Sequence, residues 1–301
     1  SAQTYFDVLI AQDTVQLTAA QKTAISQQLE QAKRNFEVGT STITDTHEAQ
    51  ARYDLVVAQE IAAANSLEIK KRTLQQLVNG EVDELSTLGA GFKLESPNPA
   101  EAQKWVADAQ QGNYQIVIAQ AAEALAAQEV AKNRGGHLPT VDAVGNYSNS
   151  TGCSFSCGDT KSISVGLQLN MPLFSGGATQ SKWREADANR EKAKQDLENT
   201  RRNVDLQTRQ AYLGVVSGIA QVQALQQALK SSESLLQASK LGQEVGVRTS
   251  LDVLNAQQQL FSTRRDLLQA QYNFLVSHLR LKAAAGSLTE ADLARINQAL
   301  R

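Results

Sequence analysis

Two aspartates carry the clearest chemical signal in the sequence, because each lies three residues after a threonine. The pattern is Thr42-x-x-Asp45 in one place and Thr249-x-x-Asp252 in the other. At the start of a helix this spacing forms a capping box, in which the hydroxyl accepts a backbone N–H and the carboxylate reaches back to the threonine N–H. Helix capping is the ordinary role of both carboxylates. That role is compatible with a second one, in which they face a pore.

The two patterns belong to an internal repeat. Each follows a Val-Gly pair, and Gly39 and Gly246 are 207 positions apart, the difference between 246 and 39. The same offset aligns Tyr5 with Tyr212 and continues past the aspartates. A glycine with positive φ ends a helix and the capping box begins the next, so the sequence predicts two copies of a helix-turn-helix unit with sharp reversals.

The remaining reactive side chains supply no catalytic constellation. The two cysteines, Cys153 and Cys157, lie in a polar stretch and favour a local disulfide in an oxidising compartment over a metal site, which needs further ligands. The histidines at 47, 137 and 278 are scattered. No acid-base pair or phosphate-binding loop converges either, so we expect neither a metal, a cofactor nor an enzyme.

Composition favours long helices. Of 301 residues, 42% are hydrophobic and 20% charged, with only 4 Pro, 1 Met and 5% aromatics. The net charge of -2 gives no reason to expect nucleic acid as a partner. No apolar run is long enough for a transmembrane helix. The first residues are not a signal peptide and resemble the inside of a helix, so the chain is expected to begin part-way through a longer protein.

Apolar residues recur every seven positions along most of the chain, as in a coiled coil. The clearest rows are Val215, Val222, Leu229, Leu236 and Leu254, Phe261, Leu268, Leu275. With the Gly and Pro positions as boundaries, the predicted segments are a helix end at 1–36, a tip and return helix at 37–80, a connecting loop at 81–98, a helix at 99–136, a strand hairpin at 137–177, a long helix at 178–243, a second tip and return helix at 244–286, and a C-terminal segment at 287–301.

The periodicity changes to two within 137–177. Apolar and polar residues alternate from Pro139 to Tyr147 and, strictly, from Ser162 to Met171. Each run has the length of a tilted strand that crosses a bilayer. Any half-buried antiparallel pair alternates in the same way, so a membrane strand and an ordinary strand pair remain equally open from this pattern.

Taken together, these stretches resemble the TolC family of outer-membrane export channels. The resemblance rests on the hairpin entry Gly135–Thr140, the exit Met171–Gly177 and the two Val-Gly turns, and it covers essentially the whole chain. It implies a mainly α fold with one antiparallel β-hairpin, whose long coiled-coil helical hairpins form a trimeric α-helical tunnel joined to an outer-membrane β-barrel. Against the family pattern the chain lacks an N-terminal helix and a first strand hairpin.

The resemblance also implies roles at the tips. The Val-Gly turns would be the periplasmic ends where the tunnel narrows and an adaptor docks: Val38, Gly39, Thr40, Val245, Gly246 and Val247. Arg248 and Asp45 occupy positions that link the two tips in the family, and with Thr42 and Thr249 they would form the gate. Asp252 matches a ring of pore carboxylates that selects cations. Where the family has a second ring of carboxylates, this sequence has Asn255, and where the family has a tyrosine that links the tips, it has Gln243. Weaker cation selectivity is therefore expected.

The function implied is that of an outer-membrane exit duct in a tripartite export system. The expected partners are two further copies of the chain, a periplasmic adaptor, an inner-membrane transporter that supplies the energy, and outer-membrane lipid. The cargo would be drugs or a secreted polypeptide. The alternative is a helical structural subunit of a filament or needle, like a flagellin, but such a subunit needs neither the period-2 hairpin nor the repeated Thr-x-x-Asp tips.

Overall fold

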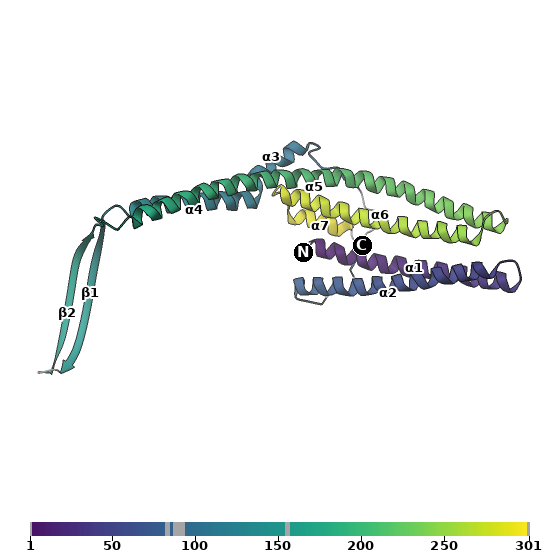
Figure 1. Ribbon diagram of the computed structural model, residues 1–301, viewed down its shortest axis with the longest axis horizontal. Helices are drawn as coiled ribbons and strands as arrows, with labels where there is room; N and C mark the ends of the chain where they lie inside the picture. Colours follow the sequence, from purple (N-terminus) through teal and green to yellow (C-terminus); the bar gives the residue numbers. More distant parts are fainter. Residues whose placement is uncertain (1, 82–84, 87–93, 154–156, 300–301) are drawn as a thin grey trace. The chain divides into compact units, whose positions relative to one another are not determined.

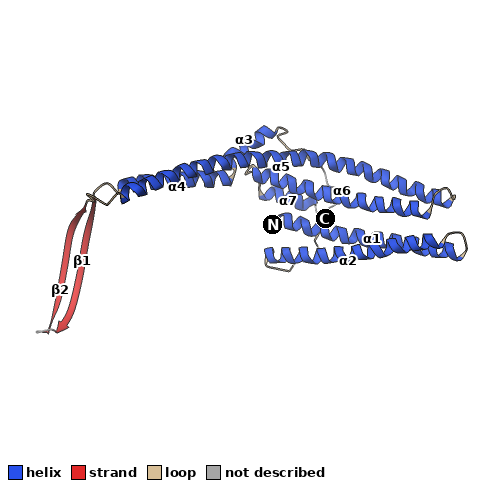
Figure 2. Ribbon diagram, viewed as in Figure 1, coloured by secondary structure: helices blue, strands red, loops and turns tan. Residues whose placement is uncertain are grey.

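The computed structural model describes residues 2–81, 85–86, 94–153 and 157–299, and within these ranges the side chains of 151–153, 157–158 and 298–299 are left aside (Figure 1). Helices account for most of these residues, together with one pair of strands (Figure 2). The elements are α1 (Ala2–Glu37), α2 (Ile43–Val78), α3 (Ala102–Gly112), α4 (Tyr114–Gly135), β1 (Thr140–Cys153), β2 (Cys157–Asn170), α5 (Ala178–Glu244), α6 (Ser250–Ala284) and α7 (Glu290–Ala299).

The chain forms two compact units, residues 1–109 with 205–301, and residues 110–204. Helix α5 contributes to both. None of the helices in the described ranges combines the length and the apolar character that spanning a bilayer requires.

In the first unit α1 and α2 lie side by side as an antiparallel hairpin (Figure 1). Two ion pairs set the register, Lys22 with Glu60 at 2.6 Å and Asp7 with Lys70 at 3.3 Å. The connection from Glu37 to Ile43 is too short for any other arrangement. The predicted return helix from Ile43 to Val78 is confirmed.

Helices α5 and α6 form the second hairpin of this unit. They approach closely because α5 carries glycines, and a Cβ atom on Gly218 would lie 3.5 Å from the Phe274 ring. Further toward the tip, Arg264 Nη2 donates to Glu233 Oε1 at 3.1 Å. The 67 residues of α5 correspond to roughly 100 Å at 1.5 Å per residue, as the sequence predicts.

The main apolar core of the first unit joins the two hairpins at the end away from the tips. Phe6 and Leu9 from α1 pack with Val215 from α5 and Tyr272 from α6, all fully buried or nearly so. Trp105 of α3 belongs to the same cluster. Within this core the Tyr272 hydroxyl donates to Asp13 Oδ2 at 2.6 Å and connects α6 directly to α1.

One predicted helix is divided in the structure. The sequence predicts a single helix over 99–136, but α3 ends at Gly112 and α4 begins at Tyr114. Asn113 has extended backbone dihedral angles, and its side-chain oxygen accepts the backbone N–H of Gln115 at 2.8 Å, as an N-cap does. The Gly112-Asn113 pair therefore ends one helix and starts another.

The strands β1 and β2 of the second unit are antiparallel neighbours, in a register that pairs Val141 with Leu169 and Tyr147 with Ile163. Directly opposed residues share a face. One face therefore carries an apolar row, consisting of Val141, Ala143, Gly145, Tyr147, Ile163, Val165, Leu167 and Leu169. The opposite face is mostly polar, and the predicted alternation is confirmed. The predicted disulfide between Cys153 and Cys157 falls on side chains outside the described ones.

Candidate functional site

The first tip is a tight reversal built on Gly39. Its φ of +74° lies in the left-handed region that favours glycine, and nothing stands within 4 Å of the position that a Cβ atom would take. The N–H of Thr40 donates to the carbonyl of Asn35 at 2.8 Å and satisfies one of the last carbonyls of α1. The sequence prediction of a glycine cap is confirmed here.

The second tip has the same geometry. Gly246 has a φ of +76°, and the N–H of Val247 donates to the carbonyl of Gly242 at 2.8 Å. Arg248 N–H donates to the same carbonyl at 3.0 Å. The repeat in the sequence is therefore a repeat in backbone structure.

Both predicted capping boxes are present. Thr42 N–H donates to Asp45 Oδ2 at 3.1 Å, and Asp45 N–H donates back to Thr42 Oγ1 at 3.3 Å. In the second tip the corresponding distances are 2.9 Å and 3.2 Å, between Thr249 and Asp252. Each threonine hydroxyl also donates to the carboxylate of its box. These bonds start α2 and α6.

The bonds of the boxes favour the ionised form of both aspartates. The Ser41 hydroxyl donates to Asp45 at 2.5 Å, and this bond, with the backbone N–H of Thr42, holds the pKa of Asp45 below its ordinary value. The backbone N–H and hydroxyl of Thr249 lower the pKa of Asp252 in the same way, with a smaller contribution from the charge of Arg248. Both carboxylates therefore carry negative charge at neutral pH.

Arg248 lies beside the aspartate of its own tip. Its Nη1 is 3.8 Å from Asp252 Oδ1, and the side chains are 56% and 37% exposed. The stem of Arg248 passes over Gly242, where a Cβ atom would come within 2.6 Å of Arg248 Cγ. Asp45 has Ser41 and Thr42 as its partners instead, and the bond between Arg248 and Asp45 stays a prediction for the assembled protein.

The proposed docking residues lie at the surface of this chain. Val38, Val245 and Val247 are large apolar side chains that are 73%, 65% and 75% exposed. An exposed apolar side chain at each turn is consistent with a surface that another molecule covers, as the sequence predicts.

Sequence reasoning missed Arg52. This residue of α2 reaches across to α6, where its Nη2 donates to Asn255 Oδ1 at 3.1 Å and its Nη1 donates to Gln258 Oε1. Asn255, which the sequence assigns to the pore, therefore also accepts a bond that connects the two hairpins. Gly242 was missed as well, although the lack of a side chain there lets the stem of Arg248 pass close to α5.

The apolar row of β1 and β2 is a second feature of the site. Its four aliphatic residues on β2 are Ile163, Val165, Leu167 and Leu169, which are 68% to 85% exposed in this chain. Aliphatic side chains in such a row are stable only against other apolar groups.

Among the described residues, no three His, Cys, Asp or Glu side chains gather closely enough to hold a metal ion.

Comparison with known proteins establishes the family. The family described as "Outer membrane efflux protein" matches residues 1–80 and 105–287. Outer membrane protein TolC of Vibrio cholerae is 34% identical over 305 residues, which are all of this chain and 70% of the relative. Outer membrane protein TolC of Escherichia coli is 34% identical over 313 residues, with 63% of the relative covered. Alkaline protease secretion protein AprF of Pseudomonas aeruginosa is 37% identical over 299 residues, which are 97% of this chain and 61% of the relative.

Solved structures agree on the fold. The outer membrane protein VceC of Vibrio cholerae aligns with a TM-score of 0.79 at 19% identity, over 95% of this chain and 68% of that one. The CmeC outer membrane channel of Campylobacter jejuni aligns with a TM-score of 0.83 at 16% identity, over 99% and 64%. The chain thus spans about two thirds of these relatives.

The match over most of the chain and the identity to the TolC proteins define a helical outer-membrane channel component. The chain belongs to the outer membrane efflux protein family, whose members include TolC, and its location is the outer membrane. Membership of this family gives no support to the alternative that the chain is a structural subunit of a filament or needle.

Proposed function

We propose that the protein is the exit duct of a tripartite export system. Cargo enters from an inner-membrane transporter through a periplasmic adaptor, passes along a helical tunnel and leaves through a β-barrel. The duct is a homotrimer, and the energy comes from the transporter, so this chain performs no catalytic step. The single observation that carries the proposal is the pair of matching tips, each with a left-handed glycine, an exposed valine and an ionised aspartate in a capping box.

The tips supply what a gate needs. Rigid hairpins place short turns side by side, and a guanidinium next to carboxylates makes bonds that are charge-assisted but reversible. In the proposed gate, Arg248 of the second tip binds Asp45 of the first tip, and movement of the flexible arginine side chain releases this bond. We propose Arg248, Asp45, Thr42 and Thr249 as the gate and Asp252 with Asn255 as the lining of the constriction.

The strand hairpin supplies the membrane contact. Its apolar row faces outward in the proposed barrel and meets outer-membrane lipid, while the polar face lines the lumen. The valines of the tips meet the adaptor. Relatives named for efflux and for protease secretion both occur, so drugs and exported polypeptides are the two candidate cargoes.

Single-channel recording from the complete gene product in a planar bilayer tests this proposal. Wild type should show a small conductance, since the tips are closed, and Arg248→Ser should show a larger one. The matched control is Arg72→Ser, which removes an exposed arginine of α2 whose ion pair with Glu68 lies within its own helix. Its conductance should equal that of wild type.

Two results would contradict the proposal. Absence of conductance from a correctly folded protein would rule out a duct. An equal rise in both variants would show that the conductance responds to the loss of any positive charge, and not to the gate.

A further inference from the structure

We propose that Arg52 is a gate-closing link, which holds α2 against α6 close to the tips and has to be released before the tips separate. This inference rests on the proposed function, since it concerns the regulation of the same gate. We use "Arg52 link" for the bonds of Arg52 with Asn255 and Gln258.

The link joins the two hairpins near their tips. Arg52 follows Asp45 by seven residues, roughly two helical turns into α2. Its partners follow Asp252 by three and six residues and lie on successive turns of α6. The planar guanidinium donates through Nη1 to one and through Nη2 to the other, so one side chain fixes both the separation and the register of the two helices.

The acceptors are neutral amides. A carboxylate in either place would add an opposite charge to the guanidinium and make a stronger ion pair. Neutral acceptors at a solvent-exposed position give a link that contributes to closure but breaks at moderate cost. This is the property that a reversible gate requires.

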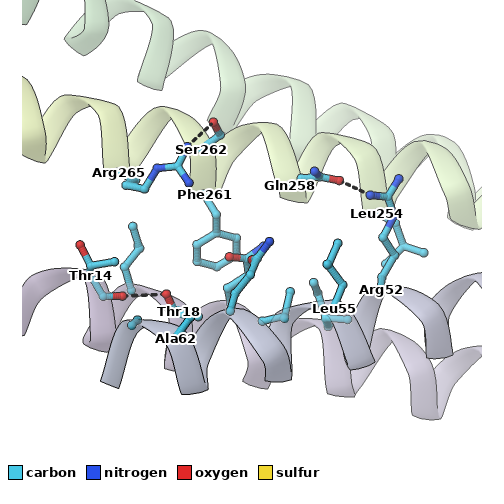
Figure 3. A pocket seen from close by; sticks show the side chains of 16 residues that line it. Thr14, Thr18, Arg52, Leu55, Ala62, Leu254, Gln258, Phe261, Ser262 and Arg265 are labelled. Carbon is cyan, nitrogen blue, oxygen red and sulfur yellow. Dashed lines mark hydrogen bonds between the residues drawn. The ribbon is translucent and has the colours of Figure 1, made fainter. Parts of the chain in front are cut away.

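Packing behind the link is sparse. A cavity of about 390 Å³ separates α6 from α1 and α2, and Arg52 and Gln258 lie at one end of it, with the ring of Phe261 pointing into it (Figure 3). Beyond the cavity, the hairpins meet again in the main core, where Tyr272 donates to Asp13. The two hairpins are thus attached at two places with a gap between them.

At the attachment nearer the tips, the Arg52 link is accompanied by one small apolar cluster. Leu254 of α6 packs there with Leu29 and Ala32 of α1 and Ala49 of α2. Separation of the tips breaks this cluster and the link while the main core stays intact. The tip half of each hairpin can therefore move about the core as a pivot.

Two substitutions move this equilibrium in opposite directions. Arg52→Met keeps an unbranched stem of similar length and removes the donors, so the tips should separate more often, by about tenfold in the ratio of open to closed tips. Asn255→Asp replaces a neutral acceptor by a carboxylate and should shift the same ratio toward closure. Arg72→Met is the matched control, because it removes an arginine from the same helix that makes no bond to α6.

The tip separation is measured as the distance between spin labels at Thr44 and Val247 by double electron–electron resonance. Both positions are exposed, and the labels are placed in the complete protein, reconstituted in liposomes, with Cys153 and Cys157 replaced by serine. Arg52→Met should broaden the distance distribution and move it to longer distances. Asn255→Asp should narrow it, and Arg72→Met should leave it as in wild type. Asn255→Ala, which removes the acceptor instead of the donor, should act like Arg52→Met and covers the case in which Arg52→Met does not fold.

Conductance of the same variants separates the inference from the proposed function. If wild type conducts but neither Arg52→Met nor Asn255→Ala changes the distances or the conductance, the link is overturned and the duct stands. If the distances change as expected but no variant conducts, the link is supported and the duct is overturned.

Discussion

Replacement of Gly242 by alanine perturbs the gate without replacing any gate residue. Gly242 lies in the last turn of α5, and the stem of Arg248 passes directly over it. A Cβ atom there would lie 2.6 Å from Arg248 Cγ, closer than real Cβ atoms approach, and 3.2 Å from Arg248 Cβ, which is a tight contact. The atom that has to move belongs to a flexible, half-exposed side chain. Gly242→Ala should therefore displace the Arg248 stem and shift the backbone by no more than a few tenths of an ångström.

The magnitudes nearly cancel for stability. Alanine in place of glycine in a helix stabilises by about 0.5–1 kcal/mol. Forcing the Arg248 stem away from its rotamer costs about 0.5–1.5 kcal/mol. The exposed ion pair of Arg248 with Asp252, which is lost as well, contributes little because solvent screens it. The thermal midpoint should thus change little, whereas the conductance should rise toward that of Arg248→Ser.

A double-mutant cycle with Arg248→Ala is the decisive assay, because alanine removes the Cγ atom that the new methyl group meets at 2.6 Å and keeps only the milder contact with Cβ at 3.2 Å. In that background Gly242→Ala should raise the thermal midpoint and leave the conductance unchanged. Gly246→Ala is the contrasting variant, since a φ of +76° strains alanine by about 1–2 kcal/mol although no atom lies nearby. If Gly242→Ala changes the conductance equally with and without the Arg248 stem, the contact is not the cause and the reasoning is wrong.

Three further predictions concern other parts of the chain. Burial raises the pKa of Asp13 more than its bond from Tyr272 lowers it, so the pKa in the folded protein lies above that in the unfolded chain. The free energy of unfolding therefore decreases as the pH rises from the unfolded pKa to the folded pKa. Asp13→Asn, which still accepts from Tyr272, should raise the thermal midpoint at pH 7 and not at pH 3; a lower midpoint at pH 7 would contradict this. Asp252→Asn should reduce cation preference, and an unchanged reversal potential across a salt gradient would count against the pore role. Leu167→Arg should cost about 2–4 kcal/mol in the membrane and reduce the yield of folded protein, while Gln168→Arg on the polar face should not; equal yields would refute the assignment of the two faces.

The local structure of the tips could be predicted from the sequence. A Val-Gly pair followed by Thr-x-x-Asp determines a left-handed glycine and a capping box through contacts within a few residues. The structure has both, at Gly39 with Asp45 and at Gly246 with Asp252. Strand alternation is equally local, since every second residue lies on the same face.

Features that depend on contacts between distant segments could not be predicted. Arg52 has the appearance of an ordinary charged residue on a helix surface, and its partners on α6 are more than 200 positions away. The pair Gly112-Asn113 did carry a signal for a helix break, because glycine often ends a helix and asparagine caps one, but the prediction ended the helix only at Gly135-Gly136. Asp45 and Arg248 were predicted as partners across the tips, and each has a partner within its own tip.

The two oxygens of Asp252 have different partners. Oδ2 accepts both bonds from Thr249, whereas Oδ1 faces Arg248. In the proposed duct, Arg248 therefore neutralises this carboxylate only while its side chain stays beside it. When Arg248 moves away, the capping bonds keep Asp252 ionised and in place, and its charge becomes available to passing ions. Ion selectivity of the duct then depends on the position of the Arg248 side chain as well as on the diameter of the pore.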